Sequence, residues 1–312
     1  MTSPAQPGQR LGNYTIAHAV DGRDGVYVAV HQLLPRRALI KILDAQPAIA
    51  ISMLREACIL DALHHPGIVR VYESGLLPDR RPWFACEHVE GPSIATVLAP
   101  GALDRIDAIA LLRDLAEVLE HAHRRGAIHC GLRPDRVILT GRTRGFSLCV
   151  TDWSDARAHD AAPAVHPPSV AARPYASPEL ACGAAIDDRV DVYALGVIAY
   201  QLLTGVPFAG WVMIGGERQH VPTEVHCPDA PRELTQLVDQ MLSHDQWDRP
   251  SSAEAHTALA WLAETLATPA VRPIGLVRIR RPRWTPSLAF SDAPPLDATS
   301  PAESDTDDLD PS

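Results

Sequence analysis

The sequence contains almost no lysine. Of its 28 basic residues, Lys41 is the one lysine and the others are arginines. An ammonium is a compact point charge, whereas a guanidinium is planar, so a lysine kept among arginines indicates a site that a guanidinium does not fit. A carboxylate and phosphate site reached through a narrow slot is of this kind. Chance placement of a single lysine is the alternative.

Other features are also missing, and each absence argues against a class of protein. The six cysteines form no CxxC pair, which indicates reduced, mostly buried thiols in a cytoplasmic protein and no metal site. The net charge of −10 argues against binding to nucleic acid. The longest nearly apolar run, residues 192–203, is too short for a membrane span, and the N-terminus has no signal-peptide pattern.

Short β-branched and apolar runs predict a small, mostly antiparallel sheet in residues 14–90. The expected strands are residues 14–20, 26–31, 38–43, 68–74 and 82–89. Apolar residues at helical spacing predict one helix over residues 51–63, with Glu56 near its middle. Residues 1–13, rich in proline, glutamine and glycine, are expected to be flexible.

The pattern changes to long helices after Gly91 and Pro92. Helices are expected at residues 106–125, 190–204, 233–243 and 252–265 of a region that runs from 91 to 267. Residues 127–185 show no periodicity, and loops of that length inside a domain are usually functional.

Residues 268–312 are rich in proline and divided by charge, with arginines first and carboxylates after them. This composition predicts a disordered tail. The alternative is that its basic part, which includes Trp284, docks on an acidic partner or on the acidic end of the same tail.

Motifs along the chain occur in a recognisable order. They are ALIK at 38–41, LREA at 54–57, EHVEG at 87–91, AIHCGLRPDRVIL at 127–139, TDWSD at 151–155, PYASPE at 174–179 and WDRPSSAEA at 247–255. Over residues 14–266 the chain resembles the bacterial Ser/Thr protein kinases of the eukaryotic-like type. The resemblance implies an α+β, bilobal fold, with a small antiparallel sheet and one helix in the N-lobe and a larger helical C-lobe.

The resemblance also implies roles for individual residues. Lys41 and Glu56 match the ion pair that holds the phosphates of ATP, and Asp152 matches the metal-binding aspartate. The other nucleotide-site positions are Val26, Leu39, Glu87 and Val89. Glu179 with Arg249, and Asp191, match residues that support the helical lobe and the backbone of the catalytic loop.

The chain departs from the family pattern HRDLKPxN at the residues that carry out phosphate transfer. Gly131 stands in place of the catalytic aspartate, Arg133 in place of the lysine and Arg136 in place of the metal-binding asparagine. Glycine cannot act as a general base, a role that typically contributes about 10²- to 10⁴-fold to the rate. We expect Arg136 to pair with Asp152 and partly replace the metal, so bound Mg²⁺ or Mn²⁺ is doubtful.

Whether the chain binds a nucleotide is a separate question from whether it transfers phosphate. The retained Lys41 argues for an ATP site, while the short turn DGRDG places Asp21 and Asp24 where phosphates would lie, and Leu39 narrows the base pocket. Lys41 can also serve only to hold the sheet against the helix through Glu56. Both interpretations stay open at this stage.

The sequence therefore favours a pseudokinase, a kinase-like protein with a regulatory or scaffold role toward another kinase or signalling partner. The alternative is an active but atypical Ser/Thr kinase in which Asp135 or Asp155 supplies the base. Small-molecule phosphotransferases share parts of the fold, but the SPE and WDRP motifs favour the protein-kinase branch. With no membrane span, we expect any input to come from the cytosol.

Overall fold

The computed structural model describes residues 5–42, 47–98, 103–141, 144–159, 172–214 and 217–266. The predicted tail, residues 268–312, lies outside the described residues.

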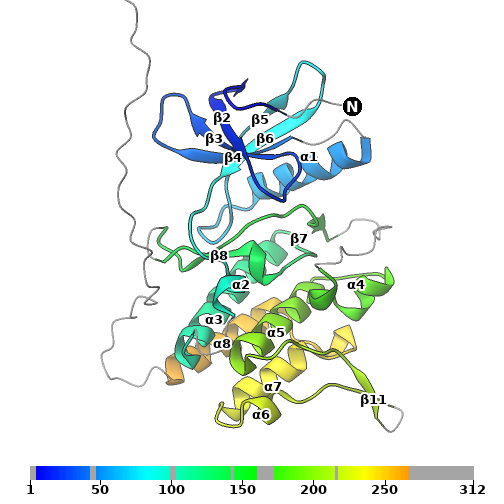
Figure 1. The fold of residues 1–312 in the computed structure, drawn as a ribbon. Helices are drawn as coiled ribbons and strands as arrows, with labels where there is room; N and C mark the ends of the chain where they lie inside the picture. The colour runs from blue at the N-terminus through cyan, green and yellow to red at the C-terminus, as the bar shows by residue number, and fades with distance from the viewer. Residues whose placement is uncertain are drawn as a thin grey trace, which may run out of the picture. The chain divides into compact units, whose positions relative to one another are not determined.

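An antiparallel sheet forms the N-terminal lobe, with its strands in the order β1-β2-β3-β4-β6-β5 (Figure 1). The strands are β1 (Arg10–Leu11), β2 (Tyr14–Ala19), β3 (Val26–His31), β4 (Arg37–Ile42), β5 (Val71–Leu76) and β6 (Pro82–Glu87). Side chains alternate across β4: Ile40 and Ile42 are buried in a small core on one face, so Lys41 lies on the other. That face is the one that helix α1 covers.

Helix α1 (Pro47–Ala62) lies across the sheet and begins four residues before the predicted start. Proline is favoured in the first turn of a helix because its missing N–H would have no partner there. Met53 and Leu60 of α1 are buried in the main core, and Glu56, between them, is also buried. The helix thus brings a carboxylate to the face of the sheet that carries Lys41.

The rest of the described chain is mainly helical and lies below the sheet in Figure 1. The helices are α2 (Ile94–Val97), α3 (Arg105–Arg124), α4 (Pro178–Cys182), α5 (Arg189–Thr204), α6 (Thr223–His226), α7 (Arg232–Met241) and α8 (Ser252–Leu266). Asp104 caps α3 by accepting a hydrogen bond from the Ile106 N–H. Gly205 ends α5 in the left-handed conformation, at φ 69°. The expected bilobal fold class is confirmed.

The main difference from the sequence-based expectation lies in residues 127–185, which contain regular structure. Two small sheets of two strands each form there. In one, β7 (Ala127–Ile128) pairs with β10 (Arg157–Ala158), and in the other, β8 (Val137–Leu139) pairs with β9 (Leu148–Val150). Strands of two or three residues are too short to show a period of two. They fix the loops that carry Gly131, Arg136 and Asp152.

Smaller differences occur elsewhere. Residues 10 and 11, expected to be flexible, pair with β2 as the edge strand β1. Strand β5 begins at Val71 rather than residue 68, because Ile68 instead forms a parallel bridge with Val150. A further hairpin, β11 (Val212–Ile214) with β12 (Glu217–Gln219), was not predicted.

The cysteines are all free thiols, and four of the six are buried. Burial raises the pKa of the Cys86 thiol to about 12, so this group is inert at neutral pH. In the described part of the chain, no helix combines the length and the apolar character that a bilayer crossing requires.

Candidate functional site

A cleft of about 430 Å³ opens between the sheet and the loops that precede and follow β8 and β9. Its lining residues come from the β2–β3 turn, β3, β4, α1 and these loops, and they are Gly22, Arg23, Val26, Lys41, Glu56, Arg133, Asp135, Asp152 and Ser154. The structure therefore brings together four of the residues predicted for a nucleotide site: Val26, Lys41, Glu56 and Asp152.

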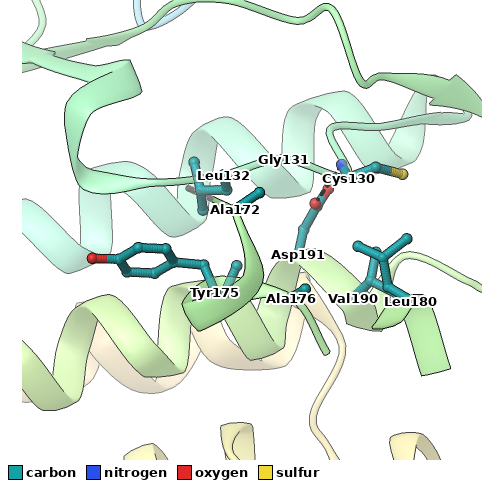
Figure 2. A pocket seen from close by; sticks show the side chains of 10 residues that line it. Cys130, Gly131, Leu132, Ala172, Tyr175, Ala176, Leu180, Val190 and Asp191 are labelled. Carbon is teal, nitrogen blue, oxygen red and sulfur yellow. Dashed lines mark hydrogen bonds between the residues drawn. The ribbon is translucent and has the colours of Figure 1, made fainter. Parts of the chain in front are cut away.

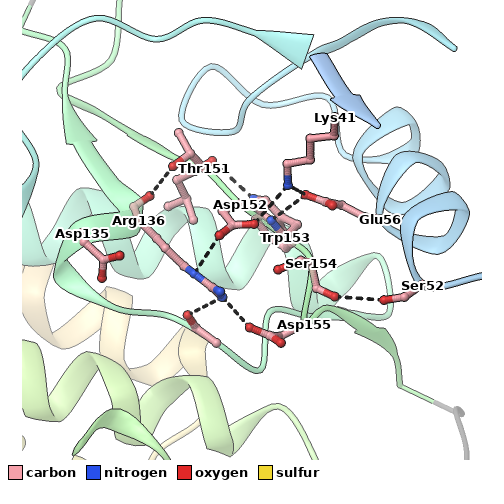
Figure 3. Close-up of polar contacts among 12 residues, drawn as sticks. Lys41, Ser52, Glu56, Asp135, Arg136, Thr151, Asp152, Trp153, Ser154 and Asp155 are labelled. Carbon is pink, nitrogen blue, oxygen red and sulfur yellow. Dashed lines mark hydrogen bonds and ion pairs between the residues drawn. The ribbon is translucent and has the colours of Figure 1, made fainter. Parts of the chain in front are cut away.

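Lys41 reaches from β4 to two carboxylates (Figure 3). Its Nζ lies 2.6 Å from Glu56 Oε1 and 3.0 Å from Asp152 Oδ1. Burial disfavours the charged ammonium, but Glu56 and Asp152 outweigh this effect and raise the pKa of Lys41. Glu56 Oε1 also accepts a hydrogen bond from the Trp153 N–H at 3.1 Å. The ion pair thus connects the sheet, α1 and the segment after β9.

Asp152 adopts a left-handed backbone conformation, at φ 56°, which is uncommon for a non-glycine residue and marks a constrained position. Its side chain contacts Lys41 through Oδ1 and Arg136 through Oδ2. Burial opposes ionisation of this carboxyl, but the two cations outweigh it and hold the pKa of Asp152 well below its ordinary value. Asp152 is therefore a carboxylate with a cation on each oxygen.

Arg136 ends a short 3₁₀ helix, η1 (Pro134–Arg136), and its side chain is 7% exposed. Its Nε lies 3.2 Å from Asp152 Oδ2, and its Nη1 donates to Asp155 Oδ2 at 2.6 Å and to the Gly131 carbonyl at 2.9 Å. Asp155, by contrast, is exposed. The guanidinium thus lies among three groups of the phosphotransfer motifs, as Figure 3 shows.

Because Gly131 has no side chain, the guanidinium of Arg136 can lie in the space beside it. A Cβ atom at residue 131 would overlap both Arg136 Nη1 and Asp155 Oδ2. The position of the missing catalytic side chain is therefore filled by the ion pair of Arg136 with Asp155. The sequence indicated the loss of the aspartate at 131, but not that other side chains take its place.

Behind Gly131 there is a small cavity of about 10 Å³, about the volume that one water needs (Figure 2). Asp191, from α5, reaches its edge and accepts hydrogen bonds from the backbone N–H groups of His129 and Cys130, at 2.7 and 2.8 Å. Asp191 thus contacts the loop backbone that the resemblance implies it holds.

Arg133 and Asp135 line the same cleft and form an ion pair at 2.8 Å. Asp135, one candidate for the missing base, thus has its own arginine partner. Asp155, the other candidate, is paired with Arg136.

The β2–β3 turn differs from expectation in the charge that it presents. Gly22 and Arg23 line the cleft, whereas Asp21 and Asp24 are not among its lining residues. Within the described residues, no carboxylate lies at ion-pair distance from Arg23, which is exposed. The acidic residues of this turn predicted a negative charge beside the phosphates, but the side chain that the turn contributes to the cleft is the arginine between them.

Three other predicted nucleotide-site residues do not line this cleft. Leu39 and Val89 are half-buried and pack against the main core. The Glu87 side chain instead pairs with Arg144, which also donates to the carbonyls of Pro66 and Ile68. Arg144, which no motif signalled, links the β8–β9 turn to the end of β6.

Glu179 and Arg249 form a bidentate pair away from the cleft, with N–O distances of 2.6 and 2.9 Å. The Arg249 side chain is fully buried and also donates to the carbonyls of Ser243, His244 and Arg189. This arrangement joins α4 to the segment before α8.

The residues around Asp152 do not fit a divalent cation. Mg²⁺ requires near-octahedral oxygen ligands at about 2.0–2.1 Å, but both oxygens of Asp152 already contact cationic nitrogens. No group of three or more histidine, cysteine or carboxylate side chains in the described residues could hold a metal ion. A guanidinium offers donors only and cannot serve as a ligand in the place of an asparagine oxygen.

Comparison with known proteins agrees with this architecture. The model of the family described as "Protein kinase domain" matches residues 21–262. The chain belongs to the protein kinase family. Among its relatives are the serine/threonine-protein kinase pkn2 of Myxococcus xanthus, 36% identical over 279 residues, and PrkC of Bacillus subtilis, 28% identical over 262 residues.

The alignment with pkn2 covers 81% of this chain but 33% of pkn2, and the alignment with PrkC covers 79% of this chain and 40% of PrkC. The chain thus matches well under half the length of these kinases. Residues 21–262, which the family model matches, include the cleft lining and the loops that carry Arg136 and Asp152.

Proposed function

We propose that this kinase-family chain is a pseudokinase, which acts through binding and conformation rather than through transfer of phosphate. The observation that carries the proposal is the position of Arg136. Its guanidinium contacts Asp152, Asp155 and the Gly131 carbonyl, and it fills the space of the catalytic side chain.

Transfer of a phosphoryl group requires a positioned base for the attacking hydroxyl and cations on the phosphates. Gly131 supplies no base. Each nearby carboxylate, Asp135 and Asp155, is already held by an arginine, at 2.8 and 2.6 Å. The loss of the base alone would lower the rate by about 10²- to 10⁴-fold.

Ion pairs that hold the kinase fold together are present. Lys41 and Glu56 form a close ion pair at the cleft, and the Glu179–Arg249 pair joins segments of the helical lobe. A kinase fold that keeps these ion pairs but does not transfer phosphate efficiently suits a regulatory or scaffold role toward another kinase or signalling protein. The six free thiols agree with a reducing compartment such as the cytoplasm.

An active but atypical Ser/Thr kinase remains the second candidate, and the position of Asp155 favours it. The Asp155 carboxylate lies beside Gly131, close to where a side chain of that residue would begin. About half of its side chain is exposed, so a substrate hydroxyl could approach it. In this alternative Asp155 accepts the proton while Arg136 stabilises the phosphate charge.

The test is transfer of the γ-phosphate from labelled ATP by the full chain, with Mg²⁺ or Mn²⁺ and a generic protein substrate. We expect the wild-type chain to incorporate no more label than Lys41→Met. Incorporation that is lost in Lys41→Met and in either Asp155→Asn or Asp135→Asn would support the atypical kinase and contradict the pseudokinase. The variant that loses it would identify which of the two candidate carboxylates is the base.

A further inference from the structure

Hydrogen bonds to the backbone of Arg136 hold this residue in place. Its backbone carbonyl accepts hydrogen bonds from the N–H of Thr151, at 2.8 Å, and from the Thr151 hydroxyl, at 3.0 Å. Thr151 immediately precedes Asp152, so the loop that carries the guanidinium is tied to the loop that carries the carboxylate. The contact between Arg136 and Asp152 therefore follows from the backbone as well as from the attraction of two charges.

Two cations already neutralise most of the negative charge around Asp152, because Lys41 and Arg136 stand against the three carboxylates Glu56, Asp152 and Asp155. Lys41 neutralises Glu56, and Arg136 lies between Asp152 and Asp155. A divalent cation placed on Asp152 would stand beside both Lys41 and Arg136 and would be repelled by each of them. It would also need an oxygen atom that one of these cations now holds.

The cleft lining carries three cations, together with the three carboxylates Glu56, Asp135 and Asp152. The cations are Lys41, Arg133 and Arg23, and Arg23 alone among these three has no carboxylate at ion-pair distance in the described residues. Arg23 is carried by the turn between β2 and β3 and lines the same cleft as Asp152. Guanidinium groups bind phosphate oxygens through paired hydrogen bonds, so this turn adds phosphate-binding capacity that no metal need supply.

We propose that the cleft binds a nucleoside di- or triphosphate in its metal-free form, with Arg136 filling the position of the divalent cation and Arg23 contacting the phosphates. The inference rests on the pseudokinase function proposed above and extends it by naming the ligand. The phosphates then meet Lys41 and Arg23, while Arg136 holds Asp152 away from them. Mg²⁺ would compete with the protein for the phosphates instead of assisting binding.

The experiment is calorimetric titration of ATP into the full chain, in EDTA and in excess Mg²⁺. We expect ATP to bind in EDTA, with equal or lower affinity when Mg²⁺ is present. Arg136→Asn removes the charge and supplies an amide oxygen, so it should weaken binding in EDTA by about tenfold or more and make binding depend on Mg²⁺. Arg136→Lys is the matched control, because it keeps the charge and should stay independent of metal.

A second variant, at an exposed residue, tests the inference even if the substitutions at residue 136 prevent folding. Arg23→Ser should weaken ATP binding in EDTA by about tenfold and leave the melting temperature without nucleotide unchanged. Strictly Mg²⁺-dependent binding by the wild-type chain, or no ATP binding at all, would overturn the inference. Either result leaves the pseudokinase proposal standing if the chain also fails to transfer phosphate, so the two failures can be told apart.

Discussion

The guanidinium of Arg136 occupies the space into which a side chain at residue 131 would project. A Cβ atom added to Gly131 would overlap Arg136 Nη1, and this nitrogen donates a hydrogen bond to the Gly131 carbonyl. The glycine and the arginine therefore depend on each other. Two departures from the kinase pattern that look independent in the sequence form a single structural unit.

This dependence predicts strong coupling between the two positions. Gly131→Ala should lower the free energy of unfolding by about 1–3 kcal/mol, because the added methyl group overpacks the site. The same substitution in an Arg136→Asn background should cost less, since of the two overlaps only the one with Asp155 Oδ2 is left. Chemical denaturation of the four proteins of this double-mutant cycle measures the coupling. Additive effects, within about 0.5 kcal/mol, would show that the two side chains do not compete for space.

Restoring the catalytic aspartate alone should not restore chemistry. Gly131→Asp introduces a carboxylate into space held by Arg136 and Asp155. We expect this variant to be less stable than wild type and still unable to transfer phosphate from labelled ATP. The combination Gly131→Asp with Arg136→Asn should recover most of the lost stability. A Gly131→Asp protein that is both stable and active would show that an aspartate at residue 131 does not compete for space with Arg136 and Asp155.

The Arg249–Glu179 pair should make a large contribution to stability. Removing one partner of a buried ion pair leaves the other charge uncompensated, which typically costs about 3–5 kcal/mol. Arg249→Ala should therefore lower the free energy of unfolding by about this amount in urea denaturation. Arg124→Ala is the control: this side chain is 65% exposed and contacts Glu120 at 3.1 Å, so its loss should cost less than about 1 kcal/mol.

Stability should fall on mild acidification because of His129. Burial lowers the pKa of this fully buried imidazole to about 4, partly offset by Asp191. The ordinary value is about 6.5, so between these two pH values the unfolded chain binds more protons than the folded one. The contribution is complete above about pH 6.5 and declines toward pH 4, at up to about 1.4 kcal/mol per pH unit.

Denaturation curves between pH 7 and pH 5 measure this effect. His129→Gln should flatten the dependence, because glutamine can still accept the hydrogen bond that the Gly131 N–H donates to His129 Nδ1. His159→Gln, at an exposed position, should leave the slope unchanged. An unchanged slope in His129→Gln would mean that other groups cause the pH dependence.

The sequence predicted those parts of the site that single motifs carry. Lys41, Glu56 and Asp152 are each marked by a short local pattern, and the structure places an oxygen of each carboxylate at 2.6 or 3.0 Å from Lys41 Nζ. The expected pairing of Arg136 with Asp152 could be inferred because both residues stand at positions that face a common ligand in the family pattern. In such cases the order of motifs already defines which residues meet.

Other features depend on packing that no motif encodes. The contact of Arg136 with Asp155 requires knowledge of how two loops cross, and the short strands that fix these loops show no periodicity. Whether Arg23 or the aspartates of its five-residue turn line the cleft depends on the backbone geometry of that turn, which no motif encodes. Arg144 reaches Glu87 across 57 residues of sequence, so neither residue signals the other.

The most direct measurement is a crystal structure of the full chain grown with ATP and Mn²⁺, with data collected where manganese scatters anomalously. We predict that the Arg136 guanidinium remains between Asp152 and Asp155 and that no anomalous peak lies on Asp152. A manganese peak bound to Asp152, with Arg136 displaced from it, would contradict the claim that this arginine takes the place of the metal.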